Sequence, residues 1–472
     1  MRPLPEVRGS TVAAEGKGDP AIRRVLPRGP QETRGNSRDR RSQILTNVSL
    51  LYVHLWVLEG AFRKWVPGLD DVFYVARDGL LVVCLLLVAM QYPAKEGRAK
   101  GTIFWTAVWA FGMFVGVQVM VEILDPIVAI AGLRNYIAPL LLIYVVWRNQ
   151  LADFWSRATW ILIIYAPIQA AIVVVQVLTP TSSYINAQVG GTEATFTTSG
   201  GIVRAAGTFS SALGLTTFVT LALAISLGVV MSGERGKRLA GAVVALFSCF
   251  LAIALGGSRG AILNAAIVII AILLQQVFAG RRASFSRTLG VGALLLAGWT
   301  FVNITLTQVL VAFGTRFENA SRSEDPLQRI LVQTFGALAE QPRLLGEGAG
   351  AHSAFGINLG SAVPWVEDDY VRWVVELGLL GYILVFARLI LAIAILATMI
   401  ARVGQLHPVQ VGTMTVLLMT LAFGSITSLP TTQGLFGICC AILISMSTDR
   451  SSVSTWGVDP EPKELSMDVR RH

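Results

Sequence analysis

The chain has 472 residues, of which 54% are hydrophobic and only 14% are charged, and its mean hydropathy is +0.62. Apolar runs of about 20 residues recur along nearly the whole length, and each is long enough to cross a bilayer. No polar stretch is long enough to build a core of its own, which excludes a second, soluble domain. The composition predicts an all-α polytopic membrane protein.

The net charge of +9 is spread in a way that excludes duplex nucleic acid as a partner. Ten basic residues lie in the first 42 positions, between Arg2 and Arg41. The others that cluster lie in short loops between apolar runs, which is the positive-inside pattern of a membrane protein. These loop clusters are Lys95/Arg98/Lys100, Arg235/Lys237/Arg238 and Arg281/Arg282/Arg287.

Taken in chain order, residues 1–42 lack an apolar core and are rich in Arg, Gly and Pro. This composition predicts a disordered cytoplasmic arm rather than a secretory signal peptide. Residues 43–447 form the expected transmembrane domain, and residues 448–472 a polar cytoplasmic tail. About twelve spans are expected, at 43–61, 72–92, 103–121, 127–147, 155–178, 213–231, 239–255, 261–278, 288–313, 369–400, 411–426 and 431–447.

The expected orientation follows from the basic loops. With a cytoplasmic N-terminus, every basic loop falls on the cytoplasmic side, and so does the C-terminus. The polar loops 179–210 and 314–368, and the tight turn at 257–260, then fall on the outer side. The fourth span contains Gly132, Arg134 and Pro139, which predicts a broken or re-entrant helix. The tenth span is longer than a bilayer needs and is expected to tilt or project outward.

The four cysteines, Cys84, Cys249, Cys439 and Cys440, all fall inside apolar runs. They are interpreted as small buried hydrophobic residues without metal or disulfide spacing. No cofactor is expected. Asp70 and Asp71 are interpreted as a turn between spans, with a metal site as the alternative.

The long loop 314–368 contains an expected surface helix. Asp325-Pro326 is an acidic cap followed by proline at the first helical position, and Pro342 ends the run. Arg329 is expected beside the apolar face of this helix. That face is formed by Leu327, Ile330, Leu331, Phe335 and Leu338, at three- and four-residue spacing.

Several arginines map to the expected outer side, where the positive-inside bias works against them. Arg259 lies in a tight turn between two spans, Arg329 on the amphipathic helix and Arg204 just after a glycine pair. Arg134 lies in the outer half of the fourth span. Guanidinium groups bind phosphate oxygens in fork geometry, so these four predict a site for a diphosphate. The alternative is ordinary loop charge.

Three consecutive acids, Glu367, Asp368 and Asp369, open the tenth expected span. They are either helix caps, with Asp368 paired to Arg372 one turn on, or a source of a general base for a sugar hydroxyl. Neighbouring carboxylates beside a low-dielectric boundary favour the second role, because one of them is then more easily protonated.

Other polar residues have structural interpretations. Glu376 is expected to pair inside its helix or to shape packing near Gly378. Arg77 and Asp78 are expected to neutralise each other. His352 in the long loop is interpreted as structural, with a role as base as the alternative.

Several of these blocks resemble the O-antigen ligase/polymerase family over about residues 50–447. The segment Ser258-Arg259-Gly260-Ala261 between two spans looks like a recurring family signature. Arg329, the run from Pro342 to Gly350 and the segment from Tyr370 to Gly381 are similar, in that order, to the shared C-terminal module of the family. Further family-like blocks are Glu59…Arg63-Lys64-Trp65 and Arg204…Gly207-Thr208-Phe209-Ser210.

The resemblance implies a type C, inverting, metal-independent glycosyltransferase in the bacterial inner membrane. Its donor would be an undecaprenyl-diphosphate-linked oligosaccharide, and its acceptor a glycan. Arg259 and Arg329 match the positions that would hold the donor diphosphate. A chain-length regulator and a flippase of the same pathway are the implied protein partners.

One departure from the family pattern bears on the acceptor. Ligases of this family commonly carry a histidine just ahead of the tenth-type helix, where this chain has Glu367, Asp368 and Asp369. The expectation is therefore a polymerase of exopolysaccharide or O-antigen, with an O-antigen ligase as the alternative. From a different class, a flippase or transporter of lipid-linked glycan is the further alternative.

Overall fold

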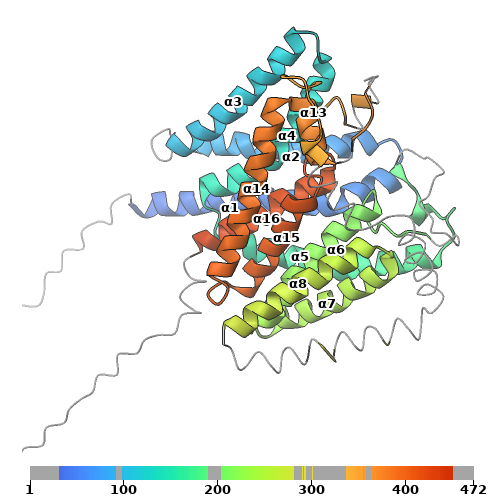
Figure 1. Cartoon of the computed structure of the whole chain (residues 1–472). Coiled ribbons are helices and arrows are strands. Elements are labelled where there is room, and N and C mark those ends of the chain that lie inside the picture. The colour runs from blue at the N-terminus through green and yellow to red at the C-terminus, as the bar shows by residue number, and fades with distance from the viewer. Residues whose placement is uncertain are drawn as a thin grey trace, which may run out of the picture. The chain divides into compact units, whose positions relative to one another are not determined.

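The computed structural model describes residues 31–91, 98–189, 203–280, 290, 292–293, 300, 336–353, 356–357, 363–366 and 368–449. Within these residues the regular structure is helical, with twelve α-helices and no strand (Figure 1). The helices are α1 (Gln31–Trp65), α2 (Asp70–Gln91), α3 (Arg98–Met120), α4 (Pro126–Asn149), α5 (Phe154–Leu178), α6 (Ala212–Ser232), α7 (Lys237–Gly256), α8 (Arg259–Phe278), α13 (Asp369–Leu377), α14 (Leu379–Ala401), α15 (Pro408–Phe423) and α16 (Pro430–Thr448). Two short 3₁₀ turns, η1 (Tyr184–Asn186) and η3 (Gly336–Leu338), complete the described part.

Ten of these helices are long and apolar enough to cross a membrane, and α15 is a shorter apolar helix. The chain is therefore a polytopic helical membrane protein, as the composition predicted. The first eight expected spans correspond to α1 to α8, and the ends of α2 to α8 agree within a few residues. The expected start of the first span is wrong, because α1 begins at Gln31, so residues 31–42, expected in the disordered arm, are helical. The arm before residue 31 lies outside the described residues. So does the ninth expected span, at 288–313, apart from residues 290, 292, 293 and 300, and so does the helix expected after Asp325, apart from its last residues.

The prediction that residues 369–400 form one long helix is wrong. The helix is broken at Gly378, between the nine residues of α13 and the 23 residues of α14. Gly378 has φ +59°, and a Cβ at this position would run into the backbone carbonyls of Arg343 and Leu344. Only glycine combines this backbone conformation with so close a contact.

The prediction that the fourth span is broken is also wrong, since α4 runs without interruption through Pro139. Proline cannot donate to the carbonyl four residues before it, here that of Asn135. Gln433 of α16 supplies the missing donor, since its Nε2 donates to Asn135 O at 3.0 Å. A neighbouring helix thereby satisfies the carbonyl that Pro139 leaves open.

The core is centred on α6, of which nearly every residue from Gly214 to Ser232 is buried. This helix packs against α5, α7, α8, α15 and α16. Its contact with α15 is close because both helices carry a glycine there: Gly228 lies against Val409, and Gly412 against Ala224. A second, smaller apolar cluster joins α3, α4, α13 and α14.

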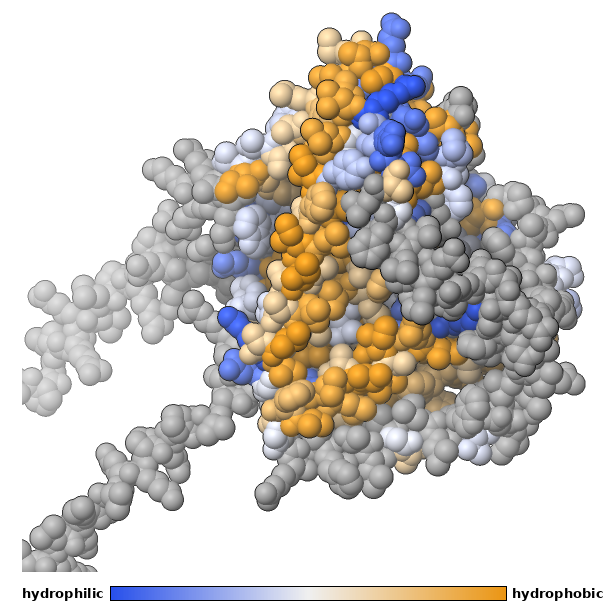
Figure 2. Space-filling view, viewed as in Figure 1, coloured by the Kyte–Doolittle hydropathy of each residue, from blue (hydrophilic) through white to orange (hydrophobic). Residues whose placement is uncertain are grey.

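The exposed face of α14 is almost entirely apolar, as expected of a helix that faces lipid. Figure 2 shows this surface as a continuous apolar band along the helix. Its exposed side chains include Leu379, Ile383, Phe386, Ile390, Ile393, Leu396 and Ile400. Because these exposed apolar residues extend along the full length of α14, we place this helix at the periphery of the bundle.

Candidate functional site

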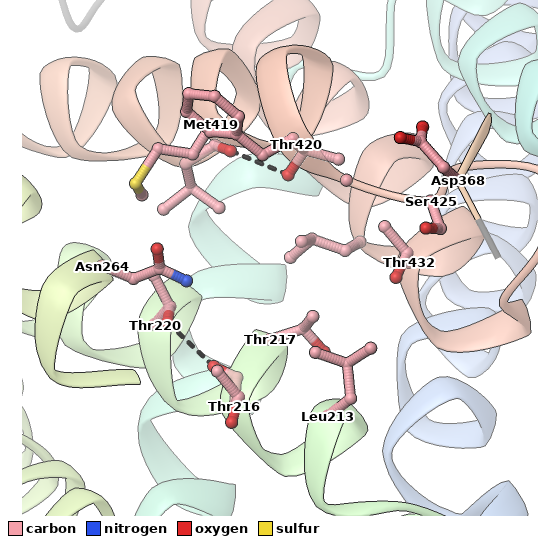
Figure 3. Close-up of a pocket in the computed structure, with 14 residues that line it drawn as sticks. Leu213, Thr216, Thr217, Thr220, Asn264, Asp368, Met419, Thr420, Ser425 and Thr432 are labelled. Atoms are coloured by element: carbon pink, nitrogen blue, oxygen red, sulfur yellow. Dashed lines mark hydrogen bonds between the residues drawn. The ribbon is translucent and has the colours of Figure 1, made fainter. Parts of the chain in front are cut away.

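A cavity of about 230 Å³ lies among four helices, at the end of the bundle where α6, α8 and α16 begin and α15 ends. We call this end the mouth end. Polar side chains from all four helices reach the cavity, together with Asp368, which precedes α13 (Figure 3). The polar lining is Thr216, Thr217, Thr220, Asn264, Asp368, Thr420, Ser425 and Thr432, and the apolar lining includes Leu213, Val416, Met419, Phe423 and Leu435.

Most of the cavity's threonines have already used their hydroxyl hydrogen. Thr216, Thr217 and Thr220 of α6 each donate to a backbone carbonyl of their own helix, at 2.7–3.0 Å. Thr420 of α15 does the same, to Val416 O at 2.8 Å. Their oxygens can still accept, because a hydroxyl has one donor and two acceptor positions.

Asn264 differs from these threonines. It is half-buried on α8, its amide faces the cavity in Figure 3, and it makes no hydrogen bond within the described residues. A polar side chain near the start of an otherwise apolar span is costly to hold there without a use. The amide is therefore positioned to meet a ligand.

The three predicted acids have different surroundings. Asp368 caps α13, with its Oδ1 accepting from the backbone N–H of Tyr370 at 2.9 Å, and it also lines the cavity. Asp369 is buried and accepts from Thr427 and Ser428 at 2.7–2.9 Å, with Arg388 of α14 at 3.5 Å. Asp369 thus fixes the turn between α15 and α16, while Asp368 faces the space beside it. Glu367 lies outside the described residues.

A buried ion pair organises the short helix α13. Arg372 Nε donates to Glu376 Oε1 at 2.9 Å, and both side chains are fully buried. The expected ion pair between Asp368 and Arg372 is therefore wrong, because Arg372 pairs with Glu376 instead. The structural pairing expected for Glu376 is confirmed. Glu376 also accepts from Tyr136 of α4 at 2.8 Å.

The glycine run after Leu345 is held against this ion pair. The backbone N–H groups of Gly350 and His352 donate to the two carboxylate oxygens of Glu376, at 2.9 and 3.0 Å. Gly350 has φ +87°, and it lies against Gly132 of α4, where a Cβ on either residue would clash with backbone. The run is therefore a packed support of α13 rather than an open loop.

His352 is buried between two acceptors. Its Nδ1 lies 2.7 Å from Pro364 O and its Nε2 lies 2.9 Å from Glu347 Oε2. The imidazole joins two parts of the loop, which agrees with the structural interpretation.

The segment that carries Arg204 is held rigidly before α6. Gln176 Oε1 accepts from the N–H groups of Ala206 and Gly207 at 3.1 and 2.8 Å. The buried Lys64 donates to Gly207 O at 2.6 Å, and Thr208 donates to Val57 O at 2.5 Å. The Gly207-Thr208 block therefore joins α1 and α5. Arg204, three residues before Gly207, is half-buried.

Arg134 and Arg77 take part in ion pairs between helices. Arg134 Nε donates to Asp78 Oδ2 of α2 at 2.5 Å, and its Nη1 donates to the Tyr74 hydroxyl at 2.7 Å. Arg77 lies 3.4 Å from Glu59 of α1 and donates to Pro430 O. The expected Arg77–Asp78 pair is therefore wrong, because adjacent residues on a helix point in different directions.

Arg259 is the first residue of α8, which also carries Asn264 less than two turns further on. Ser258 caps the helix, its Oγ accepting from Ala261 N at 3.3 Å. Arg259 is half-buried. A guanidinium beside the N-terminus of a 20-residue helix forms an electropositive end suited to an anion.

The structure brings part of the predicted set to the mouth end: Asp368 on the cavity wall, and Arg259 on a helix that lines it. Arg329 lies outside the described residues. The cavity's threonines and Asn264 were missed, although Asn264 is the only polar side chain of α8 between Arg259 and Gln275, which is a usable signal.

In the described part of the chain, no three His, Cys, Asp or Glu side chains gather as a metal site would require. Comparison with models of known protein families, with curated proteins and with solved structures gave no significant match.

Proposed function

We propose that this chain is a membrane glycosyltransferase that polymerises undecaprenyl-diphosphate-linked glycan repeats at the outer face of the bacterial inner membrane. The observation that carries the proposal is the hydroxyl-rich cavity at the mouth end, with the carboxylate of Asp368 on its wall. The resemblance of the Arg259 and Pro342–Gly350 blocks to the O-antigen ligase/polymerase family supports the same conclusion.

The proposed reaction is a displacement at the anomeric carbon of the donor glycan. The acceptor hydroxyl oxygen bonds to that carbon as the bond from carbon to the diphosphate oxygen breaks, and undecaprenyl diphosphate leaves with the electron pair. The hydroxyl proton passes to Asp368 or to its neighbour Glu367, acting as general base. Asp369 supports this arrangement indirectly, because it fixes the turn at Thr427 and Ser428.

Charge on the leaving diphosphate needs cationic partners. Arg259 at the start of α8 meets this need best among the described arginines, because the helix N-terminus adds its own positive potential. Arg329 and Arg204 are the further candidates. Arg134 has a structural role instead, since its guanidinium joins α4 to Asp78 and Tyr74 of α2.

Arg259→Ala tests the proposal with purified protein and a lipid-linked oligosaccharide, by following glycan length and released lipid diphosphate. We expect elongation to fall about 10²–10³-fold, the usual effect of removing one well-placed charge donor. Arg235→Ala, an exposed arginine in the loop between α6 and α7, is the matched control and should elongate normally. Equal elongation by the two variants would remove Arg259 from the mechanism, and activity that needs an added divalent ion after chelation would revive the alternative metal site at Asp70 and Asp71.

A transporter of lipid-linked glycan is the second candidate, and the break at Gly378 favours it. Discontinuous helices often surround transported substrates, and here the break adjoins the buried charges of Arg372 and Glu376. The carboxylate on the cavity wall favours the enzyme, because transport requires no base. Movement of intact substrate across a liposome bilayer without elongation would establish transport.

A further inference from the structure

We infer that the mouth-end cavity is a subsite for one uncharged sugar ring of the glycan, and that it excludes the diphosphate and acidic sugars. This inference rests on the proposed function and extends it, because it assigns the cavity to one chemical part of the substrate. It also makes Asn264 and Thr432 residues that determine specificity.

The hydrogen-bonding character of the lining is the first reason. The hydroxyls of Thr216, Thr217, Thr220 and Thr420 have donated to backbone carbonyls, so they offer oxygens that accept. The wall therefore consists mainly of acceptors, and it matches a ligand with many O–H donors. A sugar ring has that character, whereas a diphosphate has acceptors only.

Charge is the second reason. The only ionisable side chain in the described lining is Asp368, and no Lys, Arg or His belongs to it. A carboxylate or phosphate on the ligand would lie beside this carboxylate, and the described lining offers it no cationic side chain. The diphosphate must then lie outside the cavity, which agrees with the position of Arg259 at the start of α8.

Size and the unpartnered polar groups are the third reason. A volume of about 230 Å³ is below the range of about 300–1,000 Å³ usual for drug-sized ligands, so the cavity suits one ring rather than an oligosaccharide. Asn264 and Thr432 reach it without any hydrogen bond of their own within the described residues. Met419, Phe423 and Leu435 add an apolar wall for the C–H face of a ring.

The test is direct binding of simple sugars to the purified protein in nanodiscs, by saturation-transfer NMR. The probes are the methyl α-glycosides of glucose, galactose and mannose, with glucuronate as the acidic probe. Asn264→Leu and Thr432→Val keep the side-chain shapes and remove the polar atoms. Thr413→Val is the matched control, because Thr413 is buried on α15, away from the cavity lining, with its hydroxyl bonded to Val409 O at 2.8 Å.

We expect at least one neutral glycoside to bind, with an affinity about tenfold weaker in Asn264→Leu and in Thr432→Val, the effect of one lost hydrogen bond. Thr413→Val should bind like the wild type, and glucuronate should not bind. Absence of binding by every neutral glycoside, equal binding by the cavity variants, or glucuronate binding as tight as glucose would each overturn the inference. Sugar binding with this pattern in a protein that does not elongate lipid-linked glycan would refute the proposed function and leave the sugar subsite standing.

Discussion

Asp368 and Asp369 are adjacent in sequence and have opposite surroundings. Asp369 is 1% exposed and accepts hydrogen bonds on both oxygens from the turn before α16. Asp368 lies at the start of α13, where its side chain lines the cavity. The pair therefore separates into a framework residue and a candidate base.

The two roles predict different effects of the same substitution. Asp368→Asn keeps the cap, because Asn is as good a helix cap as Asp, but it removes the base and should lower kcat about 10²–10⁴-fold with an unchanged melting temperature. Asp369→Asn leaves Arg388 buried without its carboxylate and should destabilise the protein by about 3 kcal/mol. Kinetics and thermal unfolding of both variants in detergent check this, and the reverse pattern would exchange the two assignments.

The buried pair of Arg372 and Glu376 gives a second prediction at this scale. Glu376→Gln leaves the guanidinium uncompensated, and it weakens the contacts to Gly350 and Tyr136. We expect a loss of about 3–5 kcal/mol in stability, measured as a lower melting temperature. The control is Glu340→Gln, an exposed site that should change stability by less than about 0.5 kcal/mol. Similar melting temperatures for the two variants would show that the pair is not structural.

At the residue scale, the sequence predicted which segments contribute to the candidate site better than it predicted which side chains form ion pairs. The acids at 367–369 could be found because three carboxylates beside an apolar run are conspicuous. The partner of Arg77 could not be found, since it depends on which helices meet: Glu59 reaches Arg77 from α1. A cavity also depends on four helices at once, and no single stretch of sequence reveals it.

At the scale of elements, local signals predicted most helices and their starts to within about five residues, although not the start of α1 at Gln31. Asp125 caps α4 directly before Pro126, and Asp368 caps α13. The break at Gly378 and the continuity of α4 at Pro139 were both missed, because each depends on tertiary contact. The carbonyls of Arg343 and Leu344 require glycine at 378, and Gln433 satisfies the carbonyl that Pro139 leaves open.

The contact between α4 and the glycine run gives a prediction at this scale. Gly132→Ala places a methyl group against the backbone of Ala349 and Gly350, so it should destabilise the protein by about 1–3 kcal/mol. Gly116→Ala on α3 is the matched control, because a Cβ there meets no atom within 4 Å. The control should be neutral or slightly stabilising, since alanine favours helix over glycine. Thermal unfolding compares the two, and a stable Gly132→Ala variant would mean that α4 and the run are not packed together.

At the scale of the whole molecule, the proposal requires the mouth end to face the outside of the inner membrane. The basic loops predict this orientation. Cysteine labelling with a membrane-impermeant maleimide in intact cells tests it, because the native cysteines lie within the helices. Ser182→Cys after α5 should label from outside, whereas Arg235→Cys between α6 and α7 should label only after permeabilisation. The opposite pattern would place the cavity on the cytoplasmic side and contradict the proposed use of an outward-facing donor.

The most direct test of the central claim is a proteoliposome assay with a fluorescent undecaprenyl-diphosphate oligosaccharide. It follows three quantities in one sample: glycan length, released lipid diphosphate and the side of the bilayer on which the glycan lies. A glycosyltransferase predicts longer glycan and one lipid diphosphate released per linkage formed, both lost in Asp368→Asn. Glycan of unchanged length that crosses the bilayer, in the wild type and in Asp368→Asn alike, would contradict the account and identify a transporter.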